Sequence, residues 1–221
     1  MVPFDRGGAP PLACRVSSIR GETGRIVSHS QDAKRGEAGA AEPPRAVSRF
    51  GAIAEPLDDP ILADMFARIR ATRGHVLNIH RVVGQAPKML RAQAAYARAL
   101  REESSLPRAM QELVILRIAQ VNDSDYEQSV HRPIALACGV EAAKIDALPT
   151  WSDAPVFEPR ERAALDFVDQ AAKSGEVDDQ TFDALRQAFS PQEIVELAAL
   201  IAWYVGNSRF VRALRIASED S

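Results

Sequence analysis

The sequence is poor in cysteine and has no excess of basic residues, and each absence removes a class of function. Only 2 of its 221 residues are cysteine, and Cys14 and Cys138 lie far apart. We therefore expect no structural disulfide and infer a reducing, cytoplasmic setting. Lysine and arginine together number 27 against 30 acidic residues, so no basic excess is available to hold nucleic acid.

Long apolar runs and aromatic residues are also scarce. No apolar run approaches the about 20 residues that cross a bilayer, so we expect no membrane-spanning segment. Only 6% of the residues are aromatic and β-branched runs are few, while alanine and leucine abound. This composition favours helix over sheet, and a hydrophobic fraction of 46% suffices to bury a core. The predicted fold class is all-α.

The chain is predicted to consist of a tail and one helical domain. Residues 1–48 are rich in glycine, alanine, serine, arginine and proline without lasting periodicity, and we predict that they are disordered. An organelle-targeting peptide is the alternative for this tail, although its acidic residues count against that interpretation. Residues 49–221 are predicted to form one helical domain in which ordered structure begins near Phe50.

Capping residues, prolines and glycines mark the ends of the predicted helices. A polar residue followed by proline predicts helix starts at Asp59, Glu158 and Ser190. Further helix starts are predicted at Pro87, Pro107, Ser124 and Asp178. The last helix is apolar on nearly every side, and Gly206 within it predicts a close contact with another helix.

The sharpest candidate for chemistry is a carboxylate inside an apolar helix. Glu112 shares one stripe at helical spacing with Ile115, Leu116 and Ala119. Burying this carboxylate without a partner would cost several kcal/mol or force its protonation. Two interpretations follow: a partnered carboxylate in a functional site, or a surface ion pair with Arg108, one turn earlier.

The next helix carries three further candidates. His131 lies four residues after Glu127, so the two side chains share a helix face, and an imidazole there can act as a general acid or base. An ordinary core or surface histidine is the alternative. Glu127 also fits a capping box with Ser124, in which case its carboxylate would only serve the helix start. Tyr126 is a candidate phenol donor, with ordinary packing as its alternative.

Thiol and metal chemistry have weaker support. Cys138 lies at an apolar helix end without an adjacent cationic residue or a nearby second cysteine, so we expect a buried and unreactive thiol. His75 and His80 are five residues apart, which is not a same-face helical spacing. No carboxylate cluster accompanies them, and no metal site is predicted.

The spacing of the candidate residues resembles a known signature. Four spaced residues resemble the signature of the carboxymuconolactone decarboxylase and alkylhydroperoxidase-D-like superfamily. They are Glu112, then Ser124 after eleven intervening residues, Glu127 after two more and His131 after three more. The segments ELVILRIAQ, DYEQSVHRPIAL and FEPRERAALDFV look like the family too, and the resemblance covers residues 50–217. It implies a compact all-α domain that assembles as a homo-oligomer, often a trimer or hexamer, with sites near subunit contacts.

The departure from the signature concerns its two cysteines. The redox members of the superfamily carry CxxC, whereas this chain has Ser124 and Glu127 at those positions. Without a thiolate there is no nucleophile for a peroxide, so the peroxidase activity of that branch should not be carried over.

The thiol-free branch, similar to the decarboxylases, implies proton transfer on a small carboxylated lactone or keto acid without an organic cofactor. In this scheme His131 is the proton donor or polariser, and Glu112 orients it. Tyr126 would donate a hydrogen bond to a developing oxyanion. Arg117 and Arg132 are candidates to hold a substrate carboxylate.

Two other functions remain open. One is an alkylhydroperoxidase- or peroxiredoxin-like antioxidant activity that uses Cys138. The other is a non-catalytic oligomeric binding protein, in which Glu112 and His131 are structural partners. A binding protein predicts a closed, dry environment around His131, whereas an enzyme predicts a cavity that reaches both side chains.

Overall fold

The computed structural model of the protein describes residues 46–219. Within this range the secondary structure consists of helices without strands, which confirms the predicted all-α class. The disorder predicted for the tail concerns mainly residues 1–45, which lie outside the described residues. Ordered structure begins ahead of the expected Phe50, because the carbonyl of Val47 accepts a hydrogen bond from the N–H of Ala217 at 3.0 Å and Ser48 is buried.

The described residues form nine α-helices and one short 3-10 helix. In chain order they are α1 Pro60–Arg73, α2 Asn78–Val83, α3 Pro87–Glu102, α4 Arg108–Val121, α5 Asp125–Ala137, α6 Ala142–Ala147, η1 Leu148–Thr150, α7 Pro159–Lys173, α8 Asp179–Ala188 and α9 Pro191–Leu214.

The helices begin and end for the local reasons that the sequence indicates. Asp59 accepts hydrogen bonds from two backbone N–H groups of α1, and proline occupies the first turn. Ser190 and Glu193 form a reciprocal capping box at the start of α9. Gly74 ends α1 with φ of 84°, a left-handed conformation that glycine adopts without strain.

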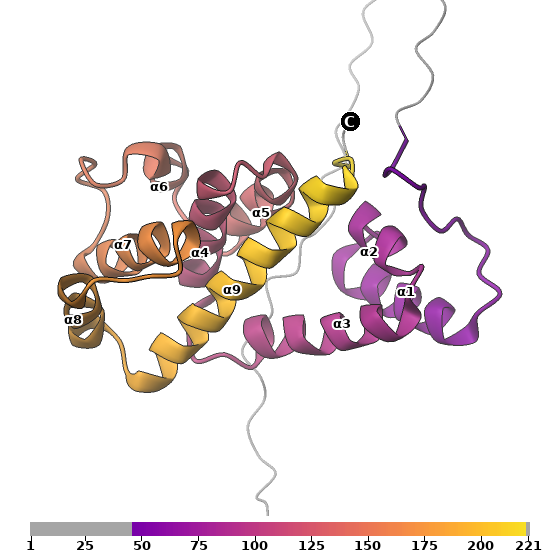
Figure 1. Cartoon of the computed structure of the whole chain (residues 1–221), viewed down its shortest axis with the longest axis horizontal. Helices are drawn as coiled ribbons and strands as arrows, with labels where there is room; N and C mark the ends of the chain where they lie inside the picture. Colours follow the sequence, from indigo (N-terminus) through magenta and orange to yellow (C-terminus); the bar gives the residue numbers. More distant parts are fainter. Residues whose placement is uncertain (1–45, 220–221) are drawn as a thin grey trace, which may run out of the picture.

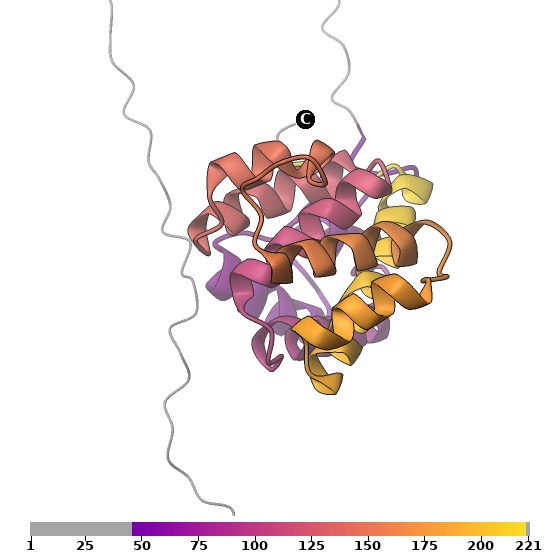
Figure 2. The same ribbon diagram turned by 90° about the vertical axis from the view of Figure 1, so that its left-hand side faces the viewer.

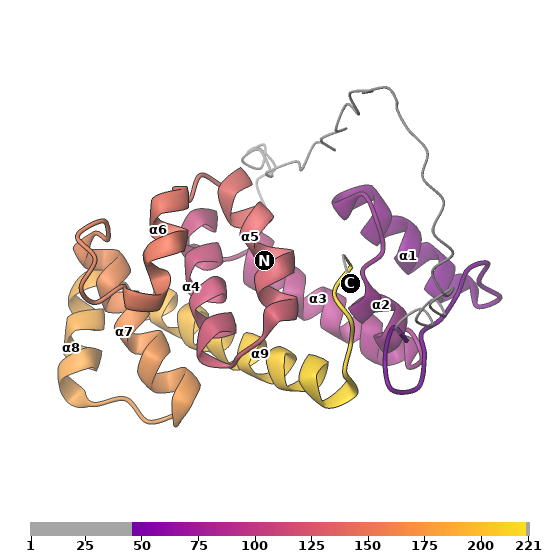
Figure 3. The ribbon, with the colours of Figure 1, turned by 90° about the horizontal axis from the view of Figure 1, so that it is seen from above.

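Helix α9 runs diagonally between two groups of helices (Figure 1). In this view α4 to α8 lie on one side of it and α1 to α3 on the other. The view from above shows the two groups at opposite ends of the molecule, with α9 spanning both (Figure 3). Figure 2, turned so that the α7 side faces the viewer, shows the N-terminal helices in purple behind this group. Helix α4 packs against α5, α7 and α9, so it occupies the middle of the larger group.

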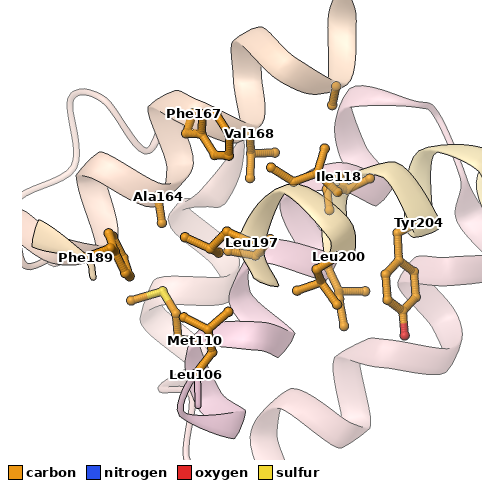
Figure 4. Close-up of a cluster of buried hydrophobic side chains, with 14 of the residues drawn as sticks. Leu106, Met110, Ile118, Ala164, Phe167, Val168, Phe189, Leu197, Leu200 and Tyr204 are labelled. Carbon is orange, nitrogen blue, oxygen red and sulfur yellow. The ribbon is translucent and has the colours of Figure 1, made fainter. Parts of the chain in front are cut away.

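The main hydrophobic cluster fills the space between α4, α7, α8 and α9 (Figure 4). Ile118, Val168 and Leu197 at its centre are fully buried, and each such side chain contributes roughly 1.5–3 kcal/mol. A second cluster joins α1 and α2 to Tyr126 and to the end of α9. A third cluster packs α4 against α5, α6 and α7. Helix α4 therefore contributes to the first and third clusters, and α5 to the second and third.

Helix α9 leaves one face of small residues uncovered within the described chain. Val195 is 67% exposed, and Gly206 is exposed with nothing within 4 Å of an added Cβ. The close helix contact predicted at Gly206 is therefore wrong for the described part of the chain. By length and composition alone α9 also suits a membrane crossing, a test that core helices of soluble proteins pass as well.

Candidate active site

Helices α4 and α5 pack side by side and bring Glu112 and His131 together. The Nδ1 atom of His131 lies 2.7 Å from Oε2 of Glu112. The two side chains come from adjacent helices, and they are 3% and 0% exposed, respectively. The pair predicted from the sequence spacing thus exists as a buried hydrogen bond.

Glu112 has a second partner on its own helix. Its Oε1 atom forms an ion pair with the guanidinium of Arg108, although the geometry is not that of a hydrogen bond. Both sequence interpretations are therefore partly right, but the ion pair involves a fully buried carboxylate and not a surface one. Burial raises the pKa of Glu112, but His131 and then Arg108 outweigh burial and lower it below its usual value. Because an ionised carboxylate only accepts hydrogen bonds, Nδ1 of His131 is the donor.

Glu127 lies on the other side of the same imidazole. Its Oε2 atom is 3.5 Å from Nε2 of His131, and Asn207 on α9 donates a hydrogen bond to its Oε1 at 2.7 Å. Burial raises the pKa of Glu127, and the opposing effects of His131 and Asn207 do not cancel it. The Glu127 carboxyl therefore keeps its proton to a higher pH than an ordinary glutamate, and it lies next to Nε2 of His131.

The structure separates the roles of the two residues at the cysteine positions. The Ser124 hydroxyl accepts the N–H of Glu127 at 3.5 Å, so Ser124 caps α5 as predicted. The N–H of Ser124 donates to the carbonyl of Ala119 at 2.9 Å and not to the Glu127 carboxylate. The reciprocal capping box is therefore wrong in its second half, because the Glu127 side chain turns towards His131.

Tyr126 is buried in the second hydrophobic cluster, and its hydroxyl already has two partners. The phenol oxygen accepts the N–H of Ile79 at 3.2 Å and donates to Oε1 of Glu219 at 3.2 Å. Burial also raises the pKa of the Tyr126 phenol. The catalytic role of Tyr126 remains a prediction, and it requires that the hydroxyl exchange Glu219 for a ligand.

Tyr204 is a site residue that sequence reasoning missed. Its ring meets the His131 ring edge-on, with centroids 5.1 Å apart, and its hydroxyl accepts a hydrogen bond from Arg101 at 3.2 Å. Figure 4 shows this hydroxyl directed away from the leucines of the main cluster. The available signal was the pair of polar groups, Tyr204 and Asn207, at helical spacing within the otherwise apolar α9.

A cavity of about 250 Å³ opens beside these residues. Its walls include His131 and Glu127, together with Tyr126 and Tyr204. Apolar side chains from α1, α3 and α9 complete much of the lining, among them Ile69, Leu90, Ala97 and Trp203. The cavity does not reach Glu112, which lies behind His131, so a ligand would meet the imidazole and Glu127 but not the orienting carboxylate.

The arginines proposed from the sequence to hold a substrate carboxylate are engaged elsewhere. Arg117 forms two hydrogen bonds of 2.6 and 2.7 Å with the carboxylate of Asp169. Arg132 bonds to Asp146 at 2.7 Å on the surface. Neither arginine lines the cavity, so this prediction is wrong. The chain instead places Arg73 and Arg101 in the cavity wall, two residues that look like ordinary surface arginines in the sequence.

Within the described residues, neither the cysteine thiol nor a group of metal-binding side chains contributes to the site. Within residues 46–219 the one cysteine is Cys138, a partly exposed residue at the end of α5 that does not line the cavity. No group of three histidine, cysteine, aspartate or glutamate side chains in this range is arranged to hold a metal ion. The arrangement around His131 is suited to moving protons between carboxyl groups, imidazole and a ligand in the cavity.

Comparison with known proteins places the site residues inside a family match. Residues 87–170 match the model of the carboxymuconolactone decarboxylase family. Over 102 residues the chain is 26% identical to the uncharacterized protein YdfG of Bacillus subtilis, which covers 45% of this chain and 69% of YdfG. The family match includes Glu112, Ser124, Glu127 and His131.

Solved structures with the same fold come from several sources. An uncharacterized peroxidase-related protein from Silicibacter sp. TM1040 superimposes with a TM-score of 0.68 and 20% identity, covering 80% of this chain and 94% of its own. A peroxidase-related protein from Ralstonia eutropha JMP134, described as an alkylhydroperoxidase AhpD core, gives 0.66 and 23%, with 80% and 94% covered.

A third solved structure contains a small ligand. A cysteine-to-alanine variant of the debrominase Bmp8 in complex with 2,3,4-tribromopyrrole superimposes with a TM-score of 0.66 and 23% identity, covering 76% of this chain and 90% of its own. Residues 87–170 of the chain match the carboxymuconolactone decarboxylase family, and the fold is shared with alkylhydroperoxidase-D-like proteins. The correspondence of Ser124 and Glu127 to the two CxxC cysteines remains a prediction.

Proposed function

We propose that the protein is a cofactor-free acid–base enzyme that acts on a small carboxylated lactone or keto acid. The observation that carries this proposal is the position of His131, at a cavity wall between the carboxyl groups of Glu112 and Glu127. Glu112 fixes the tautomer of the imidazole, as an orienting carboxylate does in acid–base sites. Glu127 supplies a proton on the side of the imidazole that faces the cavity.

A decarboxylation that uses these groups balances without a further reagent. The carbon–carbon bond to the leaving carboxylate breaks, carbon dioxide departs, and the bonding electron pair enters the conjugated carbonyl as a dienolate. Glu127 passes its proton to Nε2 of His131, and the imidazolium, stabilised by Glu112, protonates the dienolate carbon. Glu127 recovers its proton from water, so each turnover takes up one proton from solvent.

The developing oxyanion needs a hydrogen-bond donor, and a phenol at the cavity can provide it. Tyr204 accepts its hydrogen bond from Arg101, so its own hydroxyl hydrogen can point to a ligand. Tyr126 serves this step only if its hydroxyl leaves Glu219. Bmp8, which shares the fold, holds 2,3,4-tribromopyrrole, and this supports a small cyclic ligand for the cavity.

The two alternative functions have less support. An alkylhydroperoxidase-like activity would need Cys138, which does not line the cavity beside His131. A non-catalytic binding protein predicts a closed environment around His131, whereas an enzyme predicts a cavity that reaches both Glu112 and His131. The cavity reaches His131 but not Glu112, so the enzyme prediction is met in part. We also propose that the protein assembles as a homo-oligomer, as the family resemblance implies, and that it is cytoplasmic.

The test is turnover of a panel of carboxylated lactones and keto acids, followed as carbon dioxide release and proton uptake. We expect His131→Gln to lower kcat by about 10²–10⁴-fold, the usual contribution of a general acid. His75→Gln is the matched control, because this histidine is exposed and does not line the cavity. Unchanged turnover of every accepted substrate by His131→Gln would overturn the assignment.

A further inference from the structure

Two guanidinium groups in the cavity wall differ from the other arginines around them. Arg73 comes from the end of α1 and Arg101 from the end of α3, and both are partly buried. Arg68 and Arg98 at the same cavity pair with Asp64 and Glu103 at 2.9 and 2.8 Å. Within residues 46–219, no carboxylate oxygen lies within 4.0 Å of the guanidinium nitrogens of Arg73 or Arg101, the distance at which an ion pair forms.

The positive charges of Arg73 and Arg101 affect the pKa values of groups in the same wall. Burial, and then the charge of Arg101, lower the pKa of Arg73. Burial lowers the pKa of His80 in the same wall to about 3, and Arg73 and Arg101 contribute to that shift. Guanidinium groups remain charged in proteins, so the wall keeps its positive charge at neutral pH. A partly buried charge without a counter-ion is unfavourable and attracts an anion.

The described carboxylates near this wall form no ion pair with Arg73 or Arg101. Burial lowers the pKa of Arg101, but Tyr204, and then Glu112 and Glu102, outweigh burial and raise that pKa. Glu112 is already shared by Arg108 and His131, and Glu127 retains its proton to a higher pH than usual. Glu102 lines the cavity as well, but it is exposed to solvent and lies outside ion-pair distance of the described guanidinium groups. The charge on Arg73 and Arg101 therefore remains available to a ligand.

We propose that Arg73 and Arg101 bind a carboxylate of the substrate that is retained through the reaction. Arg101 donates to the hydroxyl of Tyr204, whose ring contacts His131 edge-on. A carboxylate held by Arg101 therefore lies about one aromatic ring away from the imidazole. The apolar side chains between, including Leu90, Ala97 and Trp203, suit the uncharged body of a small organic acid.

The anchored carboxylate is a different group from the one that leaves. Pairing with guanidinium stabilises a carboxylate in the ground state, which opposes its loss as carbon dioxide. The reacting group must therefore lie at His131 while a second acidic group is held by Arg73 and Arg101. This step rests on the proposed function, whereas the binding of a carboxylate at the arginines does not depend on turnover.

Binding can be measured without any reaction by isothermal titration calorimetry. The probes are straight-chain carboxylates from butanoate to octanoate and their matching amides, which keep the shape but not the charge. We expect a carboxylate of this series to bind and its amide not to bind. Arg73→Met and Arg101→Met should each weaken carboxylate binding by about tenfold or more, as expected for a lost charge-assisted hydrogen bond.

Matched variants separate a lost contact from a damaged fold. Arg91→Met is the control, because Arg91 lies exposed on the same helix as Arg101 and does not line the cavity. Arg101→Lys keeps the charge and should recover part of the affinity. The titration involves no turnover, so a failure of the acid–base proposal would leave this binding result unchanged.

Three results would overturn the inference. These are absence of binding across the carboxylate series, equal binding of the matching amide, and full affinity in both Arg73→Met and Arg101→Met. Circular dichroism checks that each variant is folded. If Arg101→Met is not folded, the affinity of Arg101→Lys tests the role of Arg101 instead.

Discussion

The two walls of the cavity balance their charges in different ways. On the α5 wall, His131 lies next to Glu127 and is held from behind by Glu112, and Glu127 accepts a hydrogen bond from Asn207. On the α1–α3 wall, Arg73 and Arg101 face the cavity without a carboxylate partner among the described residues. The first wall can form without a ligand and holds its proton-transfer groups in place. The second wall keeps a charge that a ligand must neutralise.

The largest effect is expected from removing Glu112, the carboxylate that holds His131 from behind. Glu112→Leu removes a fully buried carboxylate and leaves the Arg108 guanidinium without its partner. We expect the free energy of unfolding to fall by about 3 kcal/mol at neutral pH, the usual cost of removing one member of a buried ion pair. Guanidinium chloride unfolding measures this change. Glu141→Gln, at an exposed position, should change stability by less than about 0.5 kcal/mol.

The pH dependence adds a check on the same carboxylate. The pKa of Glu112 is lowered in the folded protein, because the effects of His131 and Arg108 outweigh burial. Its contribution to stability is therefore present above the pKa of an unfolded glutamate and is lost as the pH falls through the lower folded value. The difference in stability between the parent protein and Glu112→Leu should shrink on acidification. A difference that grows would contradict the assignment.

An intermediate loss of stability is expected when an arginine with a carboxylate partner is replaced, and a smaller change when the arginine has no such partner. Arg117→Met breaks the two hydrogen bonds to Asp169, and we expect a loss of about 2 kcal/mol. Arg73→Met removes a charge that is repelled by Arg101, so its stability should change by less than about 1 kcal/mol in either direction. Thermal and denaturant unfolding of both variants test this contrast. Equal losses for the two would show that Arg73 has a structural partner.

The smallest expected effect concerns the second carboxyl group beside His131. The pKa of Glu127 is raised by burial, so its protonated form favours the folded state. That contribution is present below the unfolded pKa and is lost as the pH rises through the higher folded value. Glu127→Gln has no carboxyl group to ionise, so its stability does not fall in this way as the pH rises. Its amide oxygen can still accept the hydrogen bond from Asn207. We expect the variant to match the parent protein at pH 5 and to exceed it by about 1 kcal/mol at pH 8.

Denaturant unfolding at the two pH values provides the measurement. A variant that loses more stability at pH 8 than at pH 5 would show that Glu127 is ionised in the folded protein. In that case the proton of the proposed reaction would have to come from His131 alone.

Much of the fold was predictable because helix ends are local. Asp59 and Ser190 cap their helices with their own side chains, and proline in the first turn needs no long-range partner. The pairing of Glu112 with His131 was also predictable, since it follows from their spacing and from the resemblance to the superfamily. These features depend on residues close in the chain or on a motif that can be recognised as a whole.

The direction of the site side chains was not predictable in the same way. Glu127 fits a capping box from its spacing alone, and only the position of Asn207 and His131 shows that its carboxyl group turns inward. Tyr126 and Tyr204 are both plausible phenols in the sequence. The backbone of Ile79 and the carboxylate of Glu219 engage the first, whereas the second meets His131.

The sequence by itself determined an all-α chain and the ends of its helices, because caps and periodicity act over short distances. The Glu112–His131 pair was implied by the resemblance to a superfamily. The tertiary structure decided which charges are satisfied. Arg117 pairs with Asp169 across the space between α4 and α7, while Arg73 and Arg101 line the cavity without a carboxylate partner among the described residues. An arginine looks the same in the sequence whether or not a carboxylate from a distant helix lies opposite, and that partner is set by the packing of the helices.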